Sequence, residues 1–113
     1  MIRIIFFISI LLLSSLTCAE QLSTVGNITS VWTYTDKNPT PGASNVLAFR
    51  LNNPLSGGCG YVWVGPNNKV FLAQVALAQA TNKAVTLYYD NTIGAPWGDS
   101  AVCAAFSIDI LIQ

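Results

Sequence analysis

The stretch from Asn67 to Asp90 limits the possible folds more than any other part of the chain. Leu, Ala and Gln, all strong helix formers, fill its first half, and Asn67 or Asn68 can cap the helix start by accepting from free backbone N–H groups. Asn82 stands where the helix should stop, because Asn tolerates the left-handed conformation of a C-terminal cap. The apolar period then changes from about 3.6 to 2. We therefore expect one helix followed directly by one strand, residues 85–90.

The expected helix carries two apolar stripes. The first stripe consists of Phe71, Val75 and Ala78. The second lies roughly opposite and consists of Val70, Ala73, Leu77 and Ala80. A surface helix in a single domain needs only one apolar stripe to face its core. The second stripe predicts an oligomer interface with another copy of the chain, and the alternative is a helix buried deep in its own domain.

The rest of the chain is typical of short strands separated by turns rich in Gly, Pro and Asn. We expect these strands at residues 27–36, 45–51, 59–64 and 101–112. In the last strand, the alternation predicts a core face made of six side chains: Val102, Ala104, Phe106, Ile108, Ile110 and Ile112. Phe49 is the other phenylalanine expected in the core.

One helix between the third and fourth of the expected strands favours a mainly β fold, a small OB-type antiparallel β-barrel. A β-grasp fold or another α+β sandwich is the alternative.

Residues 1–19 have the pattern of a cleaved secretory signal peptide. Arg3 precedes an apolar run that is too short to span a bilayer comfortably, and small residues come just before Glu20. The alternative is a lipoprotein in which Cys18 becomes the acylated first residue. We expect residues 20–113 to form a single OB-like domain that is secreted or periplasmic and has no membrane span.

Cys59 and Cys103 are the cysteines left after removal of residues 1–19. An even pair of cysteines in a small exported domain predicts a disulfide, and the long loop that it closes would add to stability.

The charge composition argues against several functions. Five basic and five acidic residues make up 9% of the chain, and this sparse balance argues against nucleic-acid binding. There is no histidine, which excludes Ser-His-Asp and Cys-His catalysis. The spacing of Asp36, Asp90, Asp99 and Asp109 fixes no catalytic pair, so we expect a protein that is not an enzyme. Calcium at Asp90, Asn91 and Asp99 is a weaker interpretation than turn formation, so we expect no metal and no cofactor.

The aromatic residues are the strongest candidates for ligand contacts. Trp32 and Tyr34 share one strand face, Tyr61 and Trp63 share another, and Trp97 lies in a Gly/Pro loop. An aromatic ring offers a flat apolar face to a sugar or a protein partner. We predict glycan contacts from Trp32, Tyr34, Asp36 and Trp97, with Asp36 bonding sugar hydroxyls. Asn27 begins an N-glycosylation acceptor pattern, whose use depends on the source of the protein.

The segment ALAQATNKAVTLYYDNTIGAPW, together with the order of elements, resembles the binding (B) subunits of subtilase-cytotoxin and pertussis-like toxins. The resemblance implies an OB-type barrel, a homopentameric ring whose helices line the central pore, and binding of sialylated or other cell-surface glycans. It also implies a catalytic A subunit as partner. The cysteine placement differs from that family. The alternative function is a monomeric exported structural or inhibitory protein that acts by protein–protein contact.

Overall fold

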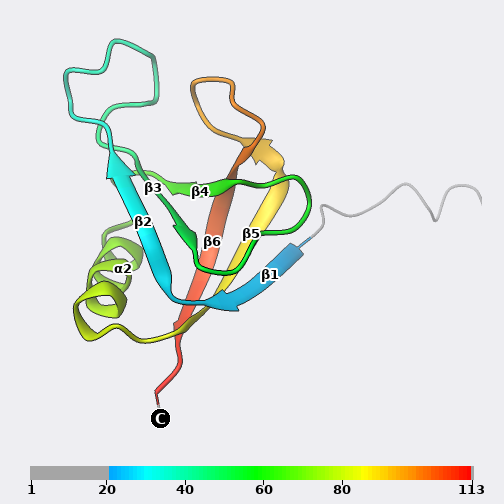
Figure 1. Ribbon diagram of the computed structural model, residues 1–113. Helices are drawn as coiled ribbons and strands as arrows, with labels where there is room; N and C mark the ends of the chain where they lie inside the picture. Colours follow the sequence, from blue (N-terminus) through cyan, green and yellow to red (C-terminus); the bar gives the residue numbers. More distant parts are fainter. Residues whose placement is uncertain (1–20, 113) are drawn as a thin grey trace, which may run out of the picture.

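The computed structural model describes residues 21–112, which form a mainly β fold with one helix beside a six-stranded sheet (Figure 1). The elements, in chain order, are β1 Gln21–Gly26, β2 Ile28–Thr33, β3 Leu47–Leu51, β4 Tyr61–Val64, α2 Lys69–Thr81, β5 Val85–Gly94 and β6 Val102–Ile110. In the sheet the strands lie in the order β1-β5-β6-β4-β3-β2. The expected signal peptide, including Cys18, lies outside the described residues.

β1 is a strand that the sequence pattern did not reveal. It pairs antiparallel with β5, and Leu22 packs against the hydrophobic core. Counting β1, the helix lies between the fourth and fifth strands, which corrects the expected position between the third and fourth. The alternation in this strand is weak, because Ser23 and Thr24 are both small and polar although they face opposite sides of the strand.

The sheet is mixed, which corrects the expectation of a wholly antiparallel one. β4 and β6 run parallel, and the other four neighbouring pairs are antiparallel. The sheet is open, so the expected closure into a barrel is not confirmed. Its two edge strands, β1 and β2, follow each other in the chain with only Asn27 between them.

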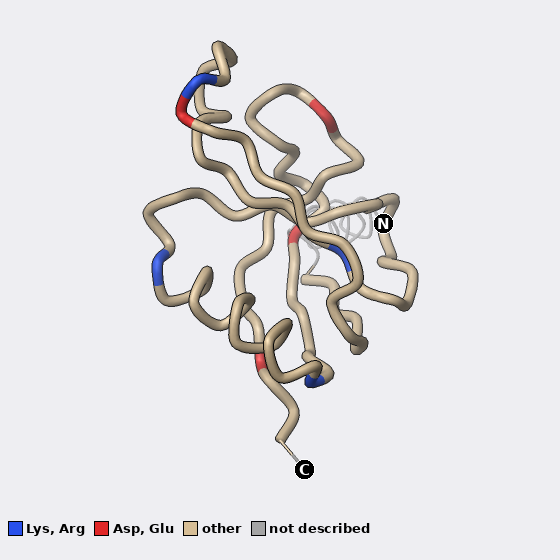
Figure 2. Tube along the Cα trace, turned by 60° about the vertical axis from the view of Figure 1, so that its left-hand side comes forward, with Lys and Arg blue, Asp and Glu red and all other residues tan. Residues whose placement is uncertain are grey.

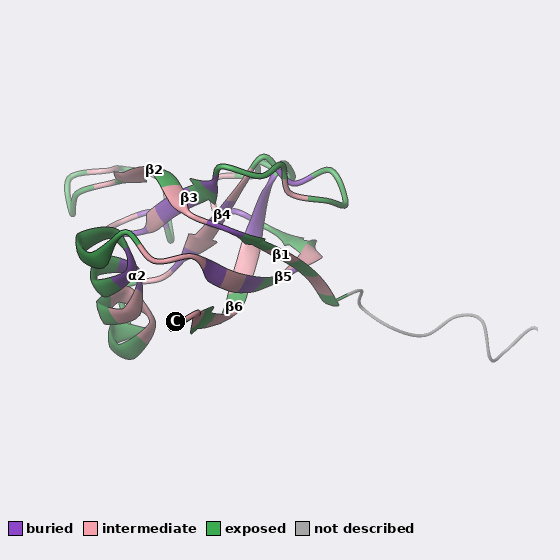
Figure 3. Ribbon diagram, turned by 60° about the horizontal axis from the view of Figure 1, so that its bottom comes forward, coloured by how far each residue is buried: buried purple, intermediate pink, exposed green. Residues whose placement is uncertain are grey.

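The hydrophobic core lies between the sheet and α2. Val85, Leu87 and Tyr89 of β5 are all buried there, as the alternation of this strand predicts. Phe49 is also buried, as predicted. Figure 3 shows that α2 turns its buried side toward the sheet and its exposed side outward.

α2 uses the first of its two apolar stripes to join the core. Val75 and Ala78 are buried, and the Phe71 ring lies 6.3 Å from that of Phe49. The helix ends at Asn82, whose φ of 51° is the left-handed cap predicted for this residue. Asn68 occupies the N-cap position, but its side chain donates to the Gly65 carbonyl and makes no hydrogen bond to the helix N–H groups.

A β-bulge in β6 corrects the expected core face of that strand. Tyr88 pairs with Ser107 and its neighbour Tyr89 pairs with Ala105, which leaves Phe106 without a partner. A bulge adds one residue to one strand and so exchanges the faces of the side chains on its two sides.

The effect of the bulge on packing is visible along the whole strand. Cys103 faces the core before the bulge, and Ile108 and Ile110 pack against the core after it. Phe106 is 45% exposed and Ile112 is 84% exposed, so the prediction that these two residues belong to the core is wrong.

Candidate functional site

Four aromatic rings meet on one side of the molecule, and we call them the aromatic cluster: Trp32, Tyr34, Tyr61 and Trp97. The Trp32 ring lies 5.0 Å from Tyr34, 5.5 Å from Trp97 and 6.1 Å from Tyr61, measured between ring centroids. Tyr34 and Trp97 are 5.0 Å apart and nearly perpendicular. All four rings are half-buried. The structure thus brings together three of the four predicted glycan contacts.

Two loops carry the outer members of the aromatic cluster. Tyr34 follows β2 directly, and its N–H donates to the Val46 carbonyl at 3.0 Å, which extends the β2–β3 pairing toward the loop. Trp97 sits in a tight turn where the Gly98 N–H donates to the Ala95 carbonyl at 2.9 Å. Gly98 has a φ of 91°, which glycine adopts readily and other residues rarely do. The two loops lie at the same end of the sheet (Figure 1).

Beside the aromatic cluster, the small side chain of Ala48 is buried on the sheet face opposite the main core. Ala48 is paired with Trp32 on one side and Trp63 on the other, so these three side chains stand in one row across β2, β3 and β4. Ala48 has no exposed surface although it faces away from Phe49, its core neighbour. The large rings beside Ala48 therefore cover it, and they are held against a packed surface.

Arg50 brings the site its positive charge. Its guanidinium carbon lies 5.2 Å from the centroid of the Tyr61 ring, which is a cation–π distance. The Ser30 hydroxyl oxygen lies 3.4 Å from the hydroxyl oxygen of Tyr61. Within residues 21–112, no carboxylate pairs with Arg50, so its charge is available to a ligand.

A polar hollow of about 400 Å³ adjoins Arg50. Its polar lining comes mainly from Thr29, Arg50, Asn52 and Asn53. One side of the hollow is therefore rich in hydrogen-bonding groups, and the Arg50–Tyr61 contact connects it to the aromatic cluster.

The fourth predicted contact, Asp36, is not brought to the rings by any contact that the structure shows. Its side chain is exposed at the start of the loop after β2. It forms no hydrogen bond or ion pair within residues 21–112. Lys37 follows it in the sequence, and Figure 2 shows the charged residues spread along the described chain.

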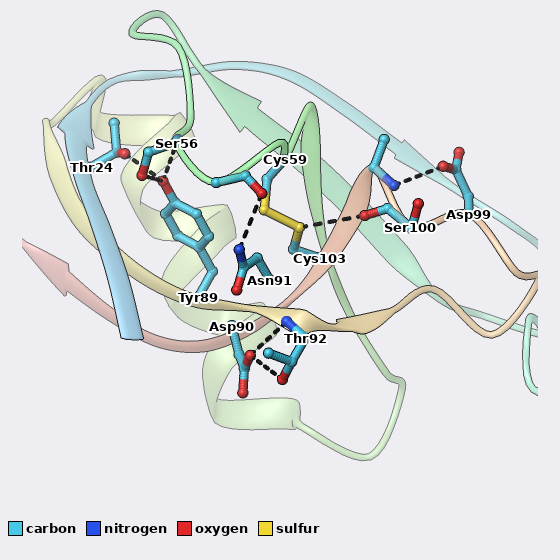
Figure 4. The surroundings of a disulfide bond; sticks show 12 residues. Thr24, Ser56, Cys59, Tyr89, Asp90, Asn91, Thr92, Asp99, Ser100 and Cys103 are labelled. Atoms are coloured by element: carbon cyan, nitrogen blue, oxygen red, sulfur yellow. Dashed lines mark hydrogen bonds between the residues drawn. A yellow bond between two sulfur atoms is a disulfide. The ribbon is translucent and has the colours of Figure 1, made fainter. Parts of the chain in front are cut away.

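The loop beside the hollow is fixed by a disulfide. Cys59 and Cys103 are bonded, as predicted, with 5.8 Å between their Cα atoms (Figure 4). Two residues farther along the chain, Tyr61 donates its N–H to the Ala101 carbonyl. The disulfide therefore ties the start of β4 to β6 next to the aromatic cluster.

The buried Tyr89 hydroxyl holds the same loop from inside. It accepts a hydrogen bond from the Ser56 N–H at 2.8 Å and lies 2.8 Å from the Thr24 hydroxyl (Figure 4). The Asn91 side chain also donates to the Gly57 carbonyl at 3.2 Å. These bonds and the disulfide give the hollow a fixed wall.

Two aspartates accept hydrogen bonds from residues two positions farther along the chain. The Asp90 carboxylate accepts from the hydroxyl of Thr92 at 2.6 Å and from its N–H at 2.8 Å. These bonds, the hydroxyl bond first, lower the pKa of Asp90 from its ordinary value, and slight desolvation opposes them. Asp99 accepts from the Ala101 N–H at 2.9 Å. Asp99 thus does what its turn position predicts, whereas Asp90 and Thr92 lie within β5 and not in the expected turn.

The second stripe of α2 is exposed, and it continues onto β6. Val70 is 78% exposed and Leu77 53% exposed. Phe106 lines one hollow with Val70, and Ile112, 84% exposed, lines another with Leu77. We call this surface the apolar strip, and its members are Val70, Ala73, Leu77, Ala80, Phe106 and Ile112. The described part of the chain does not bury the second stripe.

The sequence-based prediction did not include Arg50, and it named Tyr61 among the aromatic candidates without assigning it a ligand contact. The alternation places each of them on a definite strand face, but only the strand order shows that β4 lies next to β3 and two strands from β2.

No helix within residues 21–112 is long and apolar enough to cross a membrane. Comparisons with protein-family models, curated proteins and solved structures gave no match.

Proposed function

We propose that this chain is an exported, non-catalytic subunit that binds a cell-surface glycan and assembles into a ring of five copies. The observation that carries the proposal is the aromatic cluster, in which rings from β2, β4 and the loop before β6 converge. Half-buried, mutually supporting aromatic rings offer stacking faces to sugar rings without having to be ordered on binding.

The polar groups beside the rings suit a glycan that carries an acidic sugar. Arg50 is held by Tyr61 and has no carboxylate partner among residues 21–112. A guanidinium can bond a sugar carboxylate through two parallel hydrogen bonds. Asn52, Asn53 and Thr29 around the hollow supply donors and acceptors for sugar hydroxyls.

The strand connections support an OB-type fold for the chain. β1 and β2 are consecutive and form opposite edges of the sheet, so together they behave as one long bent strand that pairs with β5 at one end and with β3 at the other. A single strand shared by both edges is a way to close a small barrel. The position of α2 between β4 and β5 is consistent with the helix that covers one end of such a barrel.

The assembly part of the proposal draws on the exposed second stripe of α2. Val70, Ala73, Leu77 and Ala80 would face a neighbouring copy, and the complete ring would carry a catalytic A subunit. The predicted signal peptide and the Cys59–Cys103 disulfide fit a secreted or periplasmic protein, since disulfides persist in oxidising compartments.

A glycan array probed with residues 20–113 tests the ligand. We expect binding of acidic glycans, with affinity reduced about 30-fold or more by Trp32→Ala, the effect of losing an anchor aromatic. Arg50→Gln should weaken acidic glycans and leave their neutral counterparts unchanged. Val25→Ala, on the exposed side of β1, is the control and should bind as the parent does. An array without binders would overturn the glycan proposal.

Light scattering tests the ring separately. We expect a mass near five chains for the parent protein and a smaller mass for Leu77→Asp, because a charge in the second stripe would be buried between copies. A monomer that binds no glycan would instead favour the alternative, an exported structural or inhibitory protein that acts by protein–protein contact.

A further inference from the structure

The bulge in β6 exposes a phenylalanine that the strand pattern would otherwise bury. Phe106 is unpaired opposite the Tyr88–Tyr89 step and is 45% exposed. Its ring lies 6.2 Å from that of Tyr88, which is also exposed. The two rings together form an exposed aromatic pair on β5 and β6. An exposed Phe forgoes the stabilisation that burial would give, so a partner that covered this pair would gain it.

A shallow hollow lies on α2 within the same apolar strip. Its volume is about 350 Å³, and it is lined by Lys69, Val70, Ala73, Gln74 and Leu77. Ala73 forms its floor because the methyl group is smaller than the Val70 and Leu77 side chains on either side of it. A small residue between larger ones makes a hole that can receive a side chain from another chain.

We propose that Phe106 of one copy of this chain seats in the Ala73 hollow of another copy. The inference rests on the proposed assembly, whose contacts it names, and it extends the interface from α2 to the β6 bulge. Tyr88 supports the Phe106 ring from the side, and Val70 and Leu77 of the second copy close around it. Because the bulge and the hollow belong to one surface, each copy offers both halves of the contact.

The charges around the apolar strip fit a second copy better than a strongly charged partner. Lys69 lies at the start of α2 beside Val70, and Lys83 and Asp109 line the hollow beside Leu77 and Ile112. A surface with both signs can complement its own copy, whereas a surface with one sign would repel it. None of the six side chains that define the strip is charged, which is typical of the core of an interface, and Lys69 lines the Ala73 hollow beside them.

The exposed apolar area has the size that an interface needs. A standard interface buries about 800 Å² per partner, of which a little over half, about 450 Å², is non-polar. The exposed parts of Val70, Leu77, Phe106 and Ile112 together present roughly that much apolar surface. The strip is therefore large enough to hold two copies together without help from the aromatic cluster.

A mixing experiment tests the contact directly. Phe106→Ser removes the inserted side chain, and Ala73→Trp fills the hollow; both positions are exposed, so the fold should survive. We expect each variant alone to self-associate at least about tenfold more weakly than the parent in sedimentation velocity. An equal mixture of the two should recover mixed complexes, because one variant keeps its hollow and the other keeps its Phe106.

Matched measurements separate the possible outcomes. Val25→Ser changes an exposed apolar residue of β1 and should associate like the parent; unchanged circular dichroism and melting show that each variant is folded. Variants that still assemble, or a mixture that does not recover, would overturn the Phe106–Ala73 contact while leaving the ring proposal in place. A parent chain that stays monomeric at about 100 µM, where interfaces of this size normally form, would overturn both. Glycan binding by monomeric variants is independent of either result.

Discussion

The aromatic cluster and the apolar strip both present large apolar side chains to solvent, but they differ in what surrounds those side chains. The rings of the aromatic cluster contact one another, rest on Ala48 and are bordered by Arg50 and Ser30. The side chains of the strip come from α2, β6 and Ile112, and the hollow at Ala73 has Lys69 and Gln74 as its polar lining residues. Oriented rings with hydrogen-bonding groups beside them suit a small polar ligand, whereas a plain apolar surface suits another protein.

The largest expected effect comes from removing the disulfide that anchors the aromatic side. Cys59→Ser with Cys103→Ser opens a loop with a sequence separation of 44 residues. On the loop-entropy model, this lowers the free energy of unfolding by about 4 kcal/mol. Urea unfolding, followed by circular dichroism and by tryptophan fluorescence, measures the loss.

The circular dichroism and tryptophan fluorescence signals also show which region of the molecule loses structure. If the folded double variant keeps its helix signal but its tryptophan emission shifts to the red, the disulfide holds the aromatic cluster more than the apolar strip. If the free energy of unfolding of the double variant falls by less than about 1 kcal/mol, the disulfide does not stabilise this loop as we expect.

A matched pair of alanine substitutions compares the floors of the two surfaces. Ala48→Leu should cost about 1–3 kcal/mol, because extra carbon atoms have no room beneath Trp32 and Trp63. Ala73→Leu, on the exposed side of α2, should change the stability of the monomer by less than about 0.5 kcal/mol. Thermal melting of dilute protein checks both, and similar losses at the two positions would erase the distinction between a packed floor and an open hollow.

Adjacent tyrosines of β5 give a second matched pair. Tyr89→Phe removes the hydroxyl that accepts from the Ser56 N–H and should cost about 1–2 kcal/mol, since a partly buried donor loses its partner. Tyr88→Phe alters an exposed ring next to Phe106 and should change stability by less than about 0.5 kcal/mol. Hydrogen exchange of the loop around Ser56 should rise only in the Tyr89 variant; equal exchange in both would show that the loop does not depend on this hydroxyl.

The sequence predicted local features of both surfaces better than their assembly. The period change after Asn82, the buried Val85–Leu87–Tyr89 face, the disulfide and the two stripes of α2 follow from spacing and residue type alone. The prediction of a core position for Phe106 failed because a bulge depends on the register between two strands, which the alternation of one strand does not contain. The missed strand β1 has weak alternation and gains its place only by pairing with β5.

For the aromatic cluster too, local sequence patterns predict less than the long-range arrangement of the strands does. Trp32 and Tyr34 are neighbours along one strand, so their shared face was predictable from the period of 2. Tyr61, Arg50 and Trp97 join them through the strand order and through the turn at Gly98, which are long-range features. Because β4 pairs with β6 in parallel, the loop that carries Trp97 ends next to the start of β4, and no local pattern contains that pairing.

The smallest expected effect concerns pH, and it comes from Asp90 within β5, the strand that leads to the Trp97 loop. The hydrogen bonds from Thr92 lower the pKa of Asp90 in the folded protein below its ordinary value of 3.8. A carboxylate with a lowered folded-state pKa stabilises the fold above its unfolded pKa, and this contribution disappears as the pH falls through the folded value. The stability of the parent should therefore fall more steeply below about pH 4 than that of Asp90→Asn, with the two curves converging in acid.

Urea midpoints measured from pH 6 to pH 2 check this, with Asp109→Asn on the border of the apolar strip as the control. If Asp109→Asn reduced the loss of stability below pH 4 as much as Asp90→Asn does, the pH dependence would not be specific to the region beside the aromatic cluster.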